Sequence, residues 1–366
     1  MNKLIAIVAV ANLLTAVTSS AEITAEDLIS QSGLTEGPVA ARDLPRWNGA
    51  SKILIVGFAG EAREILQALL PNTELVVASS ESDALSKIVD VEAIVGSCSA
   101  PLVEAAKKLV WIQIYWSGAE SCLGVPRVAS GDVILTNMQK MSAPVIGEHA
   151  VAMALALARG LAVSAKEMQS DTRAELYTPH STMMSLSGKT MLVVGLGGIG
   201  TEAARRGAAL GMRVVGTRNS SRDGPPFVEY VGLSGELLQL AGQADVIVNA
   251  LPLTETTRGL LDAEFFDATK QGALFVNVGR GATVDTGALV AAIRDGQIAG
   301  AGLDVTDPEP LPADHPLWRF DNVIITPHVA GRGGERERHF TLLRENLRRY
   351  AAGERLLNVV DPARGY

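Results

Sequence analysis

From Lys52 onward the chain alternates short apolar runs with segments of helical pattern, and this alternation limits the possible folds more than any other feature. The apolar runs that we expect to be strands in the first half are 53–58, 74–78, 91–96, 111–115 and 132–136. Helical patterns lie between them at 61–70, 82–88 and 102–109. Apolar strands separated by helices are typical of a parallel sheet covered on both faces. The sequence therefore predicts an α/β protein.

A second alternating series begins at 190–195 and ends at 322–328. Before it we predict one long helix over 144–167, which is apolar on most sides and is expected to be buried. The polar segment 170–188 is predicted to form a connection. The last helix, at about 335–351, is rich in Arg and Glu and is expected to lie on the surface.

The length of 366 residues and the two series predict two doubly wound domains. The first is discontinuous and consists of residues 51–147 plus 330–366. The second, residues 148–329, is inserted between these two parts. Residues 22–50 show little pattern and are interpreted as an N-terminal lead-in.

Composition excludes several classes of protein. Hydrophobic residues make up 47% of the chain and charged residues 20%, which predicts a packed core. The net charge of −8 argues against a nucleic-acid partner, which favours a basic surface. The two cysteines, Cys98 and Cys122, have no zinc-ligand spacing, so we expect no metal site and two unpaired thiols. A bridge between them is the alternative if the protein is exported.

Residues 195–200 carry the strongest single motif, a G-x-G-x-x-G turn between a predicted strand and a predicted helix. Gly195 allows a tight turn, Gly197 lets the backbone approach a pyrophosphate, and Gly200 lets helix and strand pack closely. Gly198 and Ile199 complete the turn, whose free N–H groups at the helix start bind the anion. This context predicts a dinucleotide site.

The next strand, 212–216, leads to the place where an NAD-binding protein carries an acid for the adenosine ribose. Here the sequence has no acid until Asp223. The residues that stand there instead, and that suit a 2′-phosphate, are Arg218, Asn219, Ser220 and Arg222. We therefore favour NADP(H), and NAD(H) stays possible if Arg218 only stacks on adenine.

The first residues have the three parts of a secretory signal: basic Met1–Lys3, apolar Leu4–Val17, and small Ser19–Ala21. Residues 1–21 are thus predicted to be a signal peptide, and its apolar part is too short to span a bilayer. We expect an exported, periplasmic protein without an integral membrane segment. A cytoplasmic location is the alternative, because free nicotinamide dinucleotides are mainly intracellular.

Three residues at predicted strand ends suit acid–base chemistry on a keto acid. Arg280 follows a strand, and its planar guanidinium can bind a carboxylate through two hydrogen bonds. Hydride addition to a carbonyl leaves an alkoxide, which needs a proton from a group such as His328 that titrates near neutrality. A carboxylate such as Glu309 favours the imidazolium and fixes its orientation.

These segments together resemble the D-isomer-specific 2-hydroxyacid dehydrogenase family, which includes glyoxylate and hydroxypyruvate reductases. The resemblance covers roughly residues 51–366 and rests on four motifs in order: G-x-G-x-x-G, N-V-x-R-G, L-D-V…E-P-L-P and T-P-H-x-A-G. It implies a Rossmann-type coenzyme domain inserted into a flavodoxin-like substrate domain. It also implies that Arg280 binds the substrate carboxylate, that His328 is the acid or base, and that Glu309 pairs with His328.

Further cofactor contacts are implied by the same resemblance. Asp304 matches the residue that holds the nicotinamide carboxamide, and Val278 contributes backbone atoms. The remaining implied cofactor residues are Leu251, Pro252, Thr257 and Gly331.

The resemblance also implies a substrate loop, Gly96-Ser97-Cys98, whose N–H groups hold the carboxylate. Gly118 and Trp116 stand where the family usually has Ser-Ala-Gly, so Trp116 departs from the pattern. Its ring either restricts substrate size or packs in the core. Related dimers place a residue like Trp318 near the partner's pocket, so a homodimer is expected.

Three other functions share parts of this pattern. A formate dehydrogenase has the same fold and a similar Arg and His, but has Gln where Glu309 stands. A phosphoglycerate dehydrogenase-like enzyme stays an alternative, because forms without a regulatory domain exist. A non-catalytic, dinucleotide-sensing binding protein is disfavoured by the intact set of Arg280, Glu309 and His328. The favoured reaction is the interconversion of a small 2-keto acid and its D-2-hydroxy acid.

Overall fold

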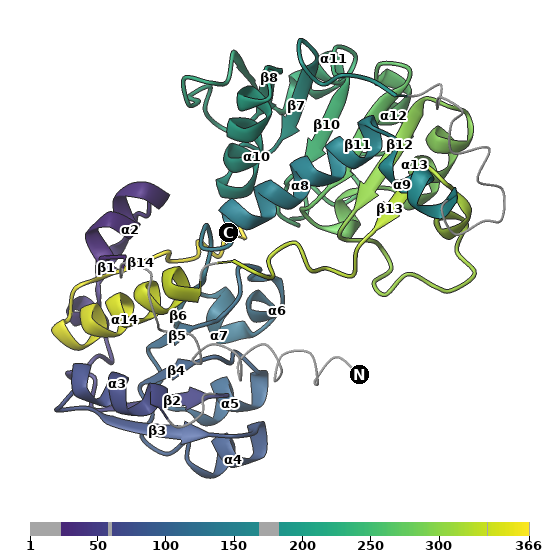
Figure 1. Ribbon diagram of the computed structural model, residues 1–366. Helices are drawn as coiled ribbons and strands as arrows, with labels where there is room; N and C mark the ends of the chain where they lie inside the picture. The colour runs from purple at the N-terminus through teal and green to yellow at the C-terminus, as the bar shows by residue number, and fades with distance from the viewer. Residues whose placement is uncertain (1–22, 58–60, 168–182, 335, 366) are drawn as a thin grey trace. The chain divides into compact units, whose positions relative to one another are not determined.

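The computed structural model describes residues 23–57, 61–167, 183–334 and 336–365. It divides into two compact units, one made of the residues before Ser142 together with those after Gly334, and the other made of Ser142–Gly334. Each unit contains a parallel sheet with helices packed on it (Figure 1), so the predicted α/β class with two parallel sheets is confirmed. The predicted signal peptide, residues 1–21, lies outside the described residues.

The first unit is built on five parallel strands, β2 (Lys52–Val56), β3 (Glu74–Ala78), β4 (Ala93–Val95), β5 (Trp111–Gln113) and β6 (Ile134–Thr136). Their order, β3-β2-β4-β5-β6, is the flavodoxin-like order that was expected. The helices between them are α3 (Glu61–Leu69), α4 (Glu81–Ser86), α5 (Ala100–Ala105), α6 (Glu120–Leu123) and α7 (Pro126–Ala129). The order changes direction between β2 and β4, which marks the place where such sheets bind ligands.

Residues 22–50, to which the sequence assigned no elements, contain helix α2 (Ala25–Ser32), strand β1 (Glu36–Ala40) and the 3₁₀ turn η1 (Ala41–Asp43). Strand β1 pairs antiparallel with β14 (Arg355–Leu357), near the other end of the chain. The two ends of the described chain thus form one small sheet beside α14 (Arg336–Ala352) (Figure 1).

Helix α14 is not the surface helix that its Arg and Glu content suggested. Leu342, Leu343, Leu347 and Tyr350 are all buried in the core of the first unit. The apolar residues recur at helical spacing and form one buried face, and most of the charged residues lie outside it, although Arg338 is buried as well. The high count of charges concealed this amphipathic pattern.

The second unit has seven strands in the order β13-β12-β11-β10-β7-β8-β9, all parallel. They are β7 (Thr190–Val194), β8 (Arg213–Thr217), β9 (Tyr230–Gly232), β10 (Val246–Asn249), β11 (Ala273–Asn277), β12 (Ile298–Leu303) and β13 (Val323–Ile325). Its helices are α8 (Ala143–Ala158), α9 (Leu161–Glu167), α10 (Gly198–Ala209), α11 (Leu237–Ala241), α12 (Ala263–Ala268) and α13 (Thr286–Arg294), with 3₁₀ turns η3 (Ser234–Glu236), η4 (Gly281–Thr283) and η5 (Pro316–Arg319). This is Rossmann-type order, and it reverses between β7 and β10.

The single helix predicted over 144–167 is two helices, α8 and α9. Gly160 between them has φ 64°, a left-handed conformation that ends α8 and that glycine adopts without a steric penalty. Helix α8 packs closely on α10, because a Cβ at Gly147 would lie 2.7 Å from Cβ of Glu202. The predicted connection 170–188 lies mostly outside the described residues.

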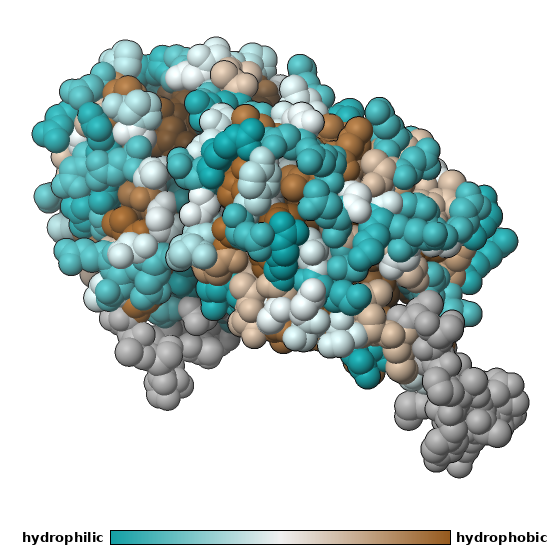
Figure 2. Space-filling view, turned by 90° about the horizontal axis from the view of Figure 1, so that it is seen from above, coloured by the Kyte–Doolittle hydropathy of each residue, from teal (hydrophilic) through white to brown (hydrophobic). Residues whose placement is uncertain are grey.

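Figure 2 shows hydrophilic side chains over much of the visible face, with hydrophobic ones between them. The large apolar side chains that are exposed include Val89, Leu161 and Trp318. Within the described residues, no helix is both long enough and apolar enough to cross a membrane.

Candidate active site

The predicted site residues of the second unit leave its sheet at one edge. Register pairs Thr217 with Val194, Val194 with Asn249, Asn249 with Asn277, Asn277 with Leu303, and Leu303 with Ile325. These residues end six neighbouring parallel strands, so their carboxyl ends are level. The loops after these strands and the first turn of α10 carry every cofactor and acid–base residue predicted for this unit, at the edge where such sheets bind ligands.

The glycine turn has the geometry that a pyrophosphate requires. Gly195 has φ 93°, which disfavours any side chain. A Cβ at Gly200 would lie 2.1 Å from the Gly195 oxygen, whereas a Cβ at Gly197 would meet nothing within 4 Å. Gly200 therefore permits close packing, and Gly197 faces open space at the start of α10, where Gly198 and Ile199 supply first-turn N–H groups.

The loop after β10 lies against this turn. Leu251 Cδ2 would be 3.1 Å from a Cβ on Gly195. The Leu251 N–H donates to Asn249 Oδ1 at 3.2 Å, and Thr257 Oγ1 donates to the Pro252 oxygen at 2.6 Å. Hydrogen bonds within the loop thus hold it beside the glycine turn, where the sequence predicted that Leu251 and Pro252 contact the cofactor.

Two arginines that the sequence assigned to a 2′-phosphate follow the end of β8, and they differ in their surroundings. Thr217, which precedes them, accepts a hydrogen bond from Gly195 N at 3.2 Å through its hydroxyl. Arg218 is half-buried, and its shielded Nε has no hydrogen-bond partner among the described residues. Asn219 and Ser220 are exposed beside it. An unsatisfied, shielded guanidinium nitrogen suits an anionic ligand.

Arg222, by contrast, is already paired. Its Nη2 lies 2.7 Å from Glu236 Oε2, and its Nη1 donates to the Tyr230 hydroxyl at 2.8 Å. Hydrogen bonds from Tyr230, from the Leu233 N–H and from Arg222 lower the pKa of Glu236 to about 2. The carboxylate is therefore charged at neutral pH and competes with any phosphate for Arg222.

A buried amide and a buried hydroxyl fix the backbone of Arg280. Asn277 is 1% exposed, and its Oδ1 accepts from the Gly279 N–H at 3.1 Å while its Nδ2 donates to the Arg280 oxygen at 3.3 Å. Thr283 Oγ1 donates to the same oxygen at 2.7 Å. The Arg280 Nη1 donates to the Gly279 oxygen at 2.9 Å. The guanidinium therefore extends from a rigid support at the end of β11.

His328 and Glu309 come together across 19 residues of sequence. His328 Nδ1 lies 2.8 Å from Glu309 Oε1, and both side chains are accessible, at 50% and 43% exposure. His328 has φ 52°, and its N–H donates to the Asp304 oxygen at 2.9 Å. Since Nδ1 faces the carboxylate, Nε2 is the ring nitrogen left for a substrate. The expected pairing of these two residues is present.

Asp304 has a contact set that the sequence did not predict. It is 3% exposed, and its carboxylate accepts from Thr326 Oγ1 at 2.6 Å, from Val329 N at 2.9 Å and from Ala330 N at 3.0 Å. His149 Nε2 hydrogen-bonds the same Thr326 hydroxyl at 3.1 Å. Asp304 therefore holds the loop that carries His328 and leads to Gly331. Only the location of Asp304 at a strand end could have suggested this.

Val278 contributes to the site through its backbone. It is 4% exposed, and its N–H donates to the Asn249 oxygen at 3.1 Å. Its backbone thus ties the end of β11 to β10, next to the loop of Leu251.

In the first unit, Cys98 and Cys122 form a disulfide, with Cα atoms 5.4 Å apart. The expectation of two unpaired thiols is therefore wrong. The fold brings together cysteines 24 residues apart, from the loop after β4 and from helix α6. Sequence spacing carries no information about such a pairing.

The other predicted substrate residues of this unit follow β4 and β5. Gly96 and Ser97 are half-buried at the end of β4. Trp116 is 39% exposed, which excludes the core packing that was one of its two interpretations. Gly118 follows it at the start of the turn into α6.

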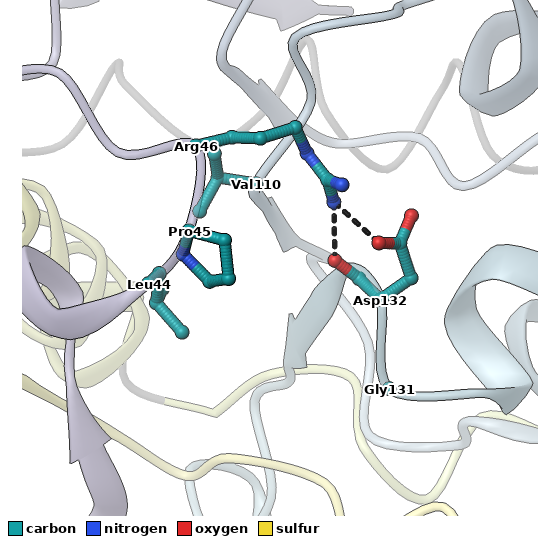
Figure 3. A pocket seen from close by; sticks show the side chains of 6 residues that line it. All are labelled: Leu44, Pro45, Arg46, Val110, Gly131 and Asp132. Carbon is teal, nitrogen blue, oxygen red and sulfur yellow. Dashed lines mark hydrogen bonds and ion pairs between the residues drawn. The ribbon is translucent and has the colours of Figure 1, made fainter.

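A shallow pocket elsewhere in the first unit holds none of the predicted site residues. Figure 3 shows Arg46 reaching Asp132, and its Nη2 donates to both Oδ1 and the backbone oxygen of Asp132 at 2.7 Å. Partial burial alone would raise the pKa of Asp132, but hydrogen bonds from Arg127 and Arg46 outweigh it and lower the pKa. Arg46 thus attaches the N-terminal segment to the residues just before β6.

Comparisons with known proteins agree with this geometry. Residues 151–330 match the family model described as D-isomer specific 2-hydroxyacid dehydrogenase, NAD binding domain. A glyoxylate reductase of Korarchaeum cryptofilum is 31% identical, covering 77% of this chain and 86% of that protein. A hydroxypyruvate reductase of Thermotoga maritima is 33% identical, covering 75% of this chain and 90% of that protein.

Solved structures are similar over most of the chain. A D-isomer specific 2-hydroxyacid dehydrogenase from Xanthobacter autotrophicus, crystallised with NADPH and MES, matches with a TM-score of 0.73. It is 28% identical, and the match covers 87% of this chain and 100% of that chain.

Proposed function

The chain belongs to the D-isomer specific 2-hydroxyacid dehydrogenase family, and we propose that it reduces a small 2-keto acid of the glyoxylate or hydroxypyruvate kind with NADPH. It is an oxidoreductase of the NAD(P)-dependent class. The observation that carries the proposal is the 2.8 Å pair of His328 and Glu309, at the sheet edge that also bears Arg280 and the glycine turn.

The bound cofactor supplies the hydride, and the residues of the chain supply the rest. Arg280 binds the substrate carboxylate and so orients the neighbouring keto group. His328 holds a proton on Nε2 and transfers it to the keto oxygen as negative charge develops there. Glu309 at Nδ1 fixes the plane and orientation of the ring. In the reverse direction His328 accepts the hydroxyl proton.

The residues at the end of β8 and just beyond it favour NADP(H). Thr217 occupies the strand end without offering a carboxylate to a ribose, and Arg218 has an unsatisfied Nε. Arg218, Asn219 and Ser220 bind the 2′-phosphate in this proposal, and Arg222 joins them only after leaving Glu236. The related structure solved with NADPH supports this preference. NAD(H) can still be accepted at lower affinity.

The substrate residues of the first unit complete the proposal. The N–H groups of the loop at Gly96, Ser97 and Cys98 bind the carboxylate of the keto acid. Trp116 limits the size of its side chain, because a large indole leaves little room near the substrate, and Gly118 lies beside the substrate two residues further along. This selects acids with short side chains.

The oligomeric state and the cellular compartment of the protein depend on different features of the chain. We take the protein to be a homodimer in which Trp318, 48% exposed, approaches the partner's pocket. We also take it to be exported. The signal-like N-terminus supports export, and so does the Cys98–Cys122 disulfide, because such bonds persist in oxidising compartments.

A panel of 2-keto acids tests the activity. Purified protein is mixed with NADPH or NADH and with glyoxylate, hydroxypyruvate, pyruvate, a branched 2-keto acid or 3-phosphohydroxypyruvate. We expect the largest kcat/KM with NADPH and an unphosphorylated acid of two or three carbons, and D-glycerate as the product of hydroxypyruvate. A preference for the phosphorylated acid would instead favour a phosphoglycerate dehydrogenase-like enzyme. No oxidation of either cofactor with any acid would leave only a binding role.

A further inference from the structure

The loop Gly96–Ser99 leaves the first unit's sheet at its ligand-binding position. It follows β4, and the strand order β3-β2-β4 changes direction next to it. In open parallel sheets, ligands bind outside the carboxyl ends of the strands at this point. The topology of the first unit therefore assigns a ligand to this loop independently of any motif.

The two ends of the loop are held by the backbone. The Gly96 N–H donates to the Gln113 oxygen at 2.7 Å, and a Cβ at Gly96 would lie 2.5 Å from the Val56 oxygen. At the other end, the Ser99 oxygen accepts from the Val103 N–H at 3.0 Å as α5 begins. Between these ends, Cys98 is 7% exposed and packs in the hydrophobic core of the unit.

A disulfide holds the middle of the loop. Ser97 Oγ accepts from Ser99 N at 3.3 Å, which is a contact within the loop itself. The covalent bond between the middle of the loop and the rest of the unit is Cys98–Cys122. Cys122 is fully buried on α6, in the hydrophobic core that also contains Leu102 and Val128. The disulfide therefore connects an anion-binding loop to a rigid part of the core.

The same bond joins two loops that the proposed function uses. Helix α6 begins two residues after Gly118. The segment before it is already fixed, because the Trp116 oxygen accepts from Met138 N at 3.1 Å and the Ser117 oxygen accepts from Asn137 Nδ2 at 2.7 Å. Through the disulfide, the loop of Gly96 is held relative to this fixed segment.

We propose that the Cys98–Cys122 disulfide is a positioning element of the substrate site, which holds the N–H groups of Gly96–Cys98 in place for the keto acid carboxylate. The inference rests on the proposed function. When the disulfide is reduced, the keto acid binds more weakly, and dinucleotide binding in the other unit is unchanged. The bond thereby links full activity to an oxidising environment.

The test compares the oxidised enzyme with two forms that lack the bond. One is wild type reduced with a phosphine, which takes oxygen from a water while each sulfur gains a hydrogen, and the phosphine is removed before assay. The other is Cys122→Ala, which leaves the substrate loop itself unchanged. In both forms we expect the KM for hydroxypyruvate to rise about tenfold, below the ~100-fold that a 1 Å misplacement can cause. The KM for NADPH should change by less than about twofold.

Two controls separate positioning from general stability. Val128→Ala removes buried methyl groups from the same core without touching the disulfide, and should lower Tm while leaving the KM for hydroxypyruvate unchanged. Phosphine treatment should have no effect on Cys122→Ala. If titration finds two thiols in the reduced, folded wild type and the KM for hydroxypyruvate is unchanged, the disulfide has only a structural role.

Binding of oxamate, an unreactive 2-keto acid analogue, distinguishes this inference from the proposed function. We expect calorimetry in the presence of NADPH to give a Kd about tenfold higher after reduction. A protein that shows this change but has no turnover would disprove the reductase and retain the positioning role. Equal Kd values in both redox forms would disprove the positioning role, whatever the turnover.

Discussion

At the scale of single residues, Asp304 shows how a site depends on groups that do not touch the substrate. Its carboxylate accepts hydrogen bonds from Thr326, Val329 and Ala330, the residues on either side of His328. His328 itself has φ 52°, a conformation that a non-glycine residue keeps only when its surroundings impose it. Asp304 provides those surroundings, so the position of the imidazole depends on a buried acid.

Asp304→Asn should therefore impair catalysis although it is nearly isosteric. An amide has one acceptor oxygen, so its NH₂ group would face one of the N–H donors of Val329 or Ala330. We expect kcat to fall at least about tenfold and the free energy of unfolding to fall by about 1–3 kcal/mol. Thr326→Val, which removes only one of these donors, is the milder control. Unchanged kcat in Asp304→Asn would mean that the loop keeps its shape without the carboxylate.

The roles of His328 and Glu309 predict a graded series. His328→Ala should lower kcat by ~10²–10⁴-fold, the usual contribution of a positioned acid–base group. Glu309→Gln keeps a hydrogen bond to Nδ1 but removes the charge, so its loss of kcat should be smaller. Fluorescence titration with NADPH should give the same Kd for both variants and wild type. A His328→Ala enzyme with more than half of the wild-type kcat would assign the proton to another group.

The two arginines after β8 should differ in their effect on cofactor choice. Arg218→Glu should shift the ratio of kcat/KM values from NADPH toward NADH by about 100-fold, because a charged hydrogen bond of ~1.5–3 kcal/mol is replaced by repulsion. Arg222→Glu should shift it less, since Arg222 is paired with Glu236. Equal shifts would show that Arg222 leaves Glu236 when the cofactor binds.

Sequence reasoning succeeded for residues whose location follows from strand ends. Arg280 and His328 are each three residues past the end of a strand, and strand ends in a parallel sheet are level, so their common edge was predictable. The disulfide and the contacts of Asp304 were not, because they depend on loop conformation and on side-chain directions that spacing does not encode.

At the scale of elements, the errors share one cause: local composition was weighed above tertiary packing. Helix α14 is rich in Arg and Glu, yet Leu343 and Leu347 lie in the core. The break between α8 and α9 depends on the φ of Gly160, and an isolated glycine in an apolar helix is often tolerated. Strand β1 has a partner, β14, more than 300 residues away, and no local pattern predicts such a pairing.

Charged contacts fix α14 to β1, and Glu345 lies at their centre. Arg349 Nε donates to Glu345 Oε1 at 2.6 Å, and Arg349 also pairs with Glu36 of β1 at 2.7 Å. Burial alone would raise the pKa of Glu345, but hydrogen bonds from Arg348 and Arg349 outweigh it and lower the pKa. The folded state therefore favours the charged carboxylate, and this stabilisation is present above the ordinary glutamate pKa.

Glu345→Gln should consequently destabilise the protein by about 1–2 kcal/mol at pH 7, between the values for exposed and for fully buried pairs. As pH falls below ~4.3, the wild type must take up a proton at Glu345 and loses the stabilisation, so the two Tm values should converge. Glu337→Gln, half-buried in the first turn of the same helix, is the control. A Tm difference that is constant from pH 7 to pH 3 would show that the charge of Glu345 is not the cause.

At the scale of the whole molecule, each unit has the same kind of ligand position. The strand order reverses between β2 and β4 in the first unit and between β7 and β10 in the second. The sequence motifs predicted the second position directly, since a glycine turn follows β7. The first position depended on resemblance, because Gly96-Ser97-Cys98 has no chemistry distinctive enough to be recognised alone. Strand order supplies the missing argument.

The redox state of the Cys98–Cys122 pair provides a test of export. A chain that keeps a cytoplasmic location meets a thiol-reducing pool, and the Cys98–Cys122 bond would then be reduced. A chain that is exported loses residues 1–21 and meets an oxidising compartment.

We therefore expect intact-mass analysis of the native protein to find chains that begin at Glu22 and are lighter by the two hydrogens of the bond. The matched control is a chain engineered to start at Glu22 and made in the cytoplasm, which should carry two free thiols until it is oxidised. Native protein that retains Met1 and both thiols would assign it to the cytoplasm, and the disulfide would then form only under oxidative stress.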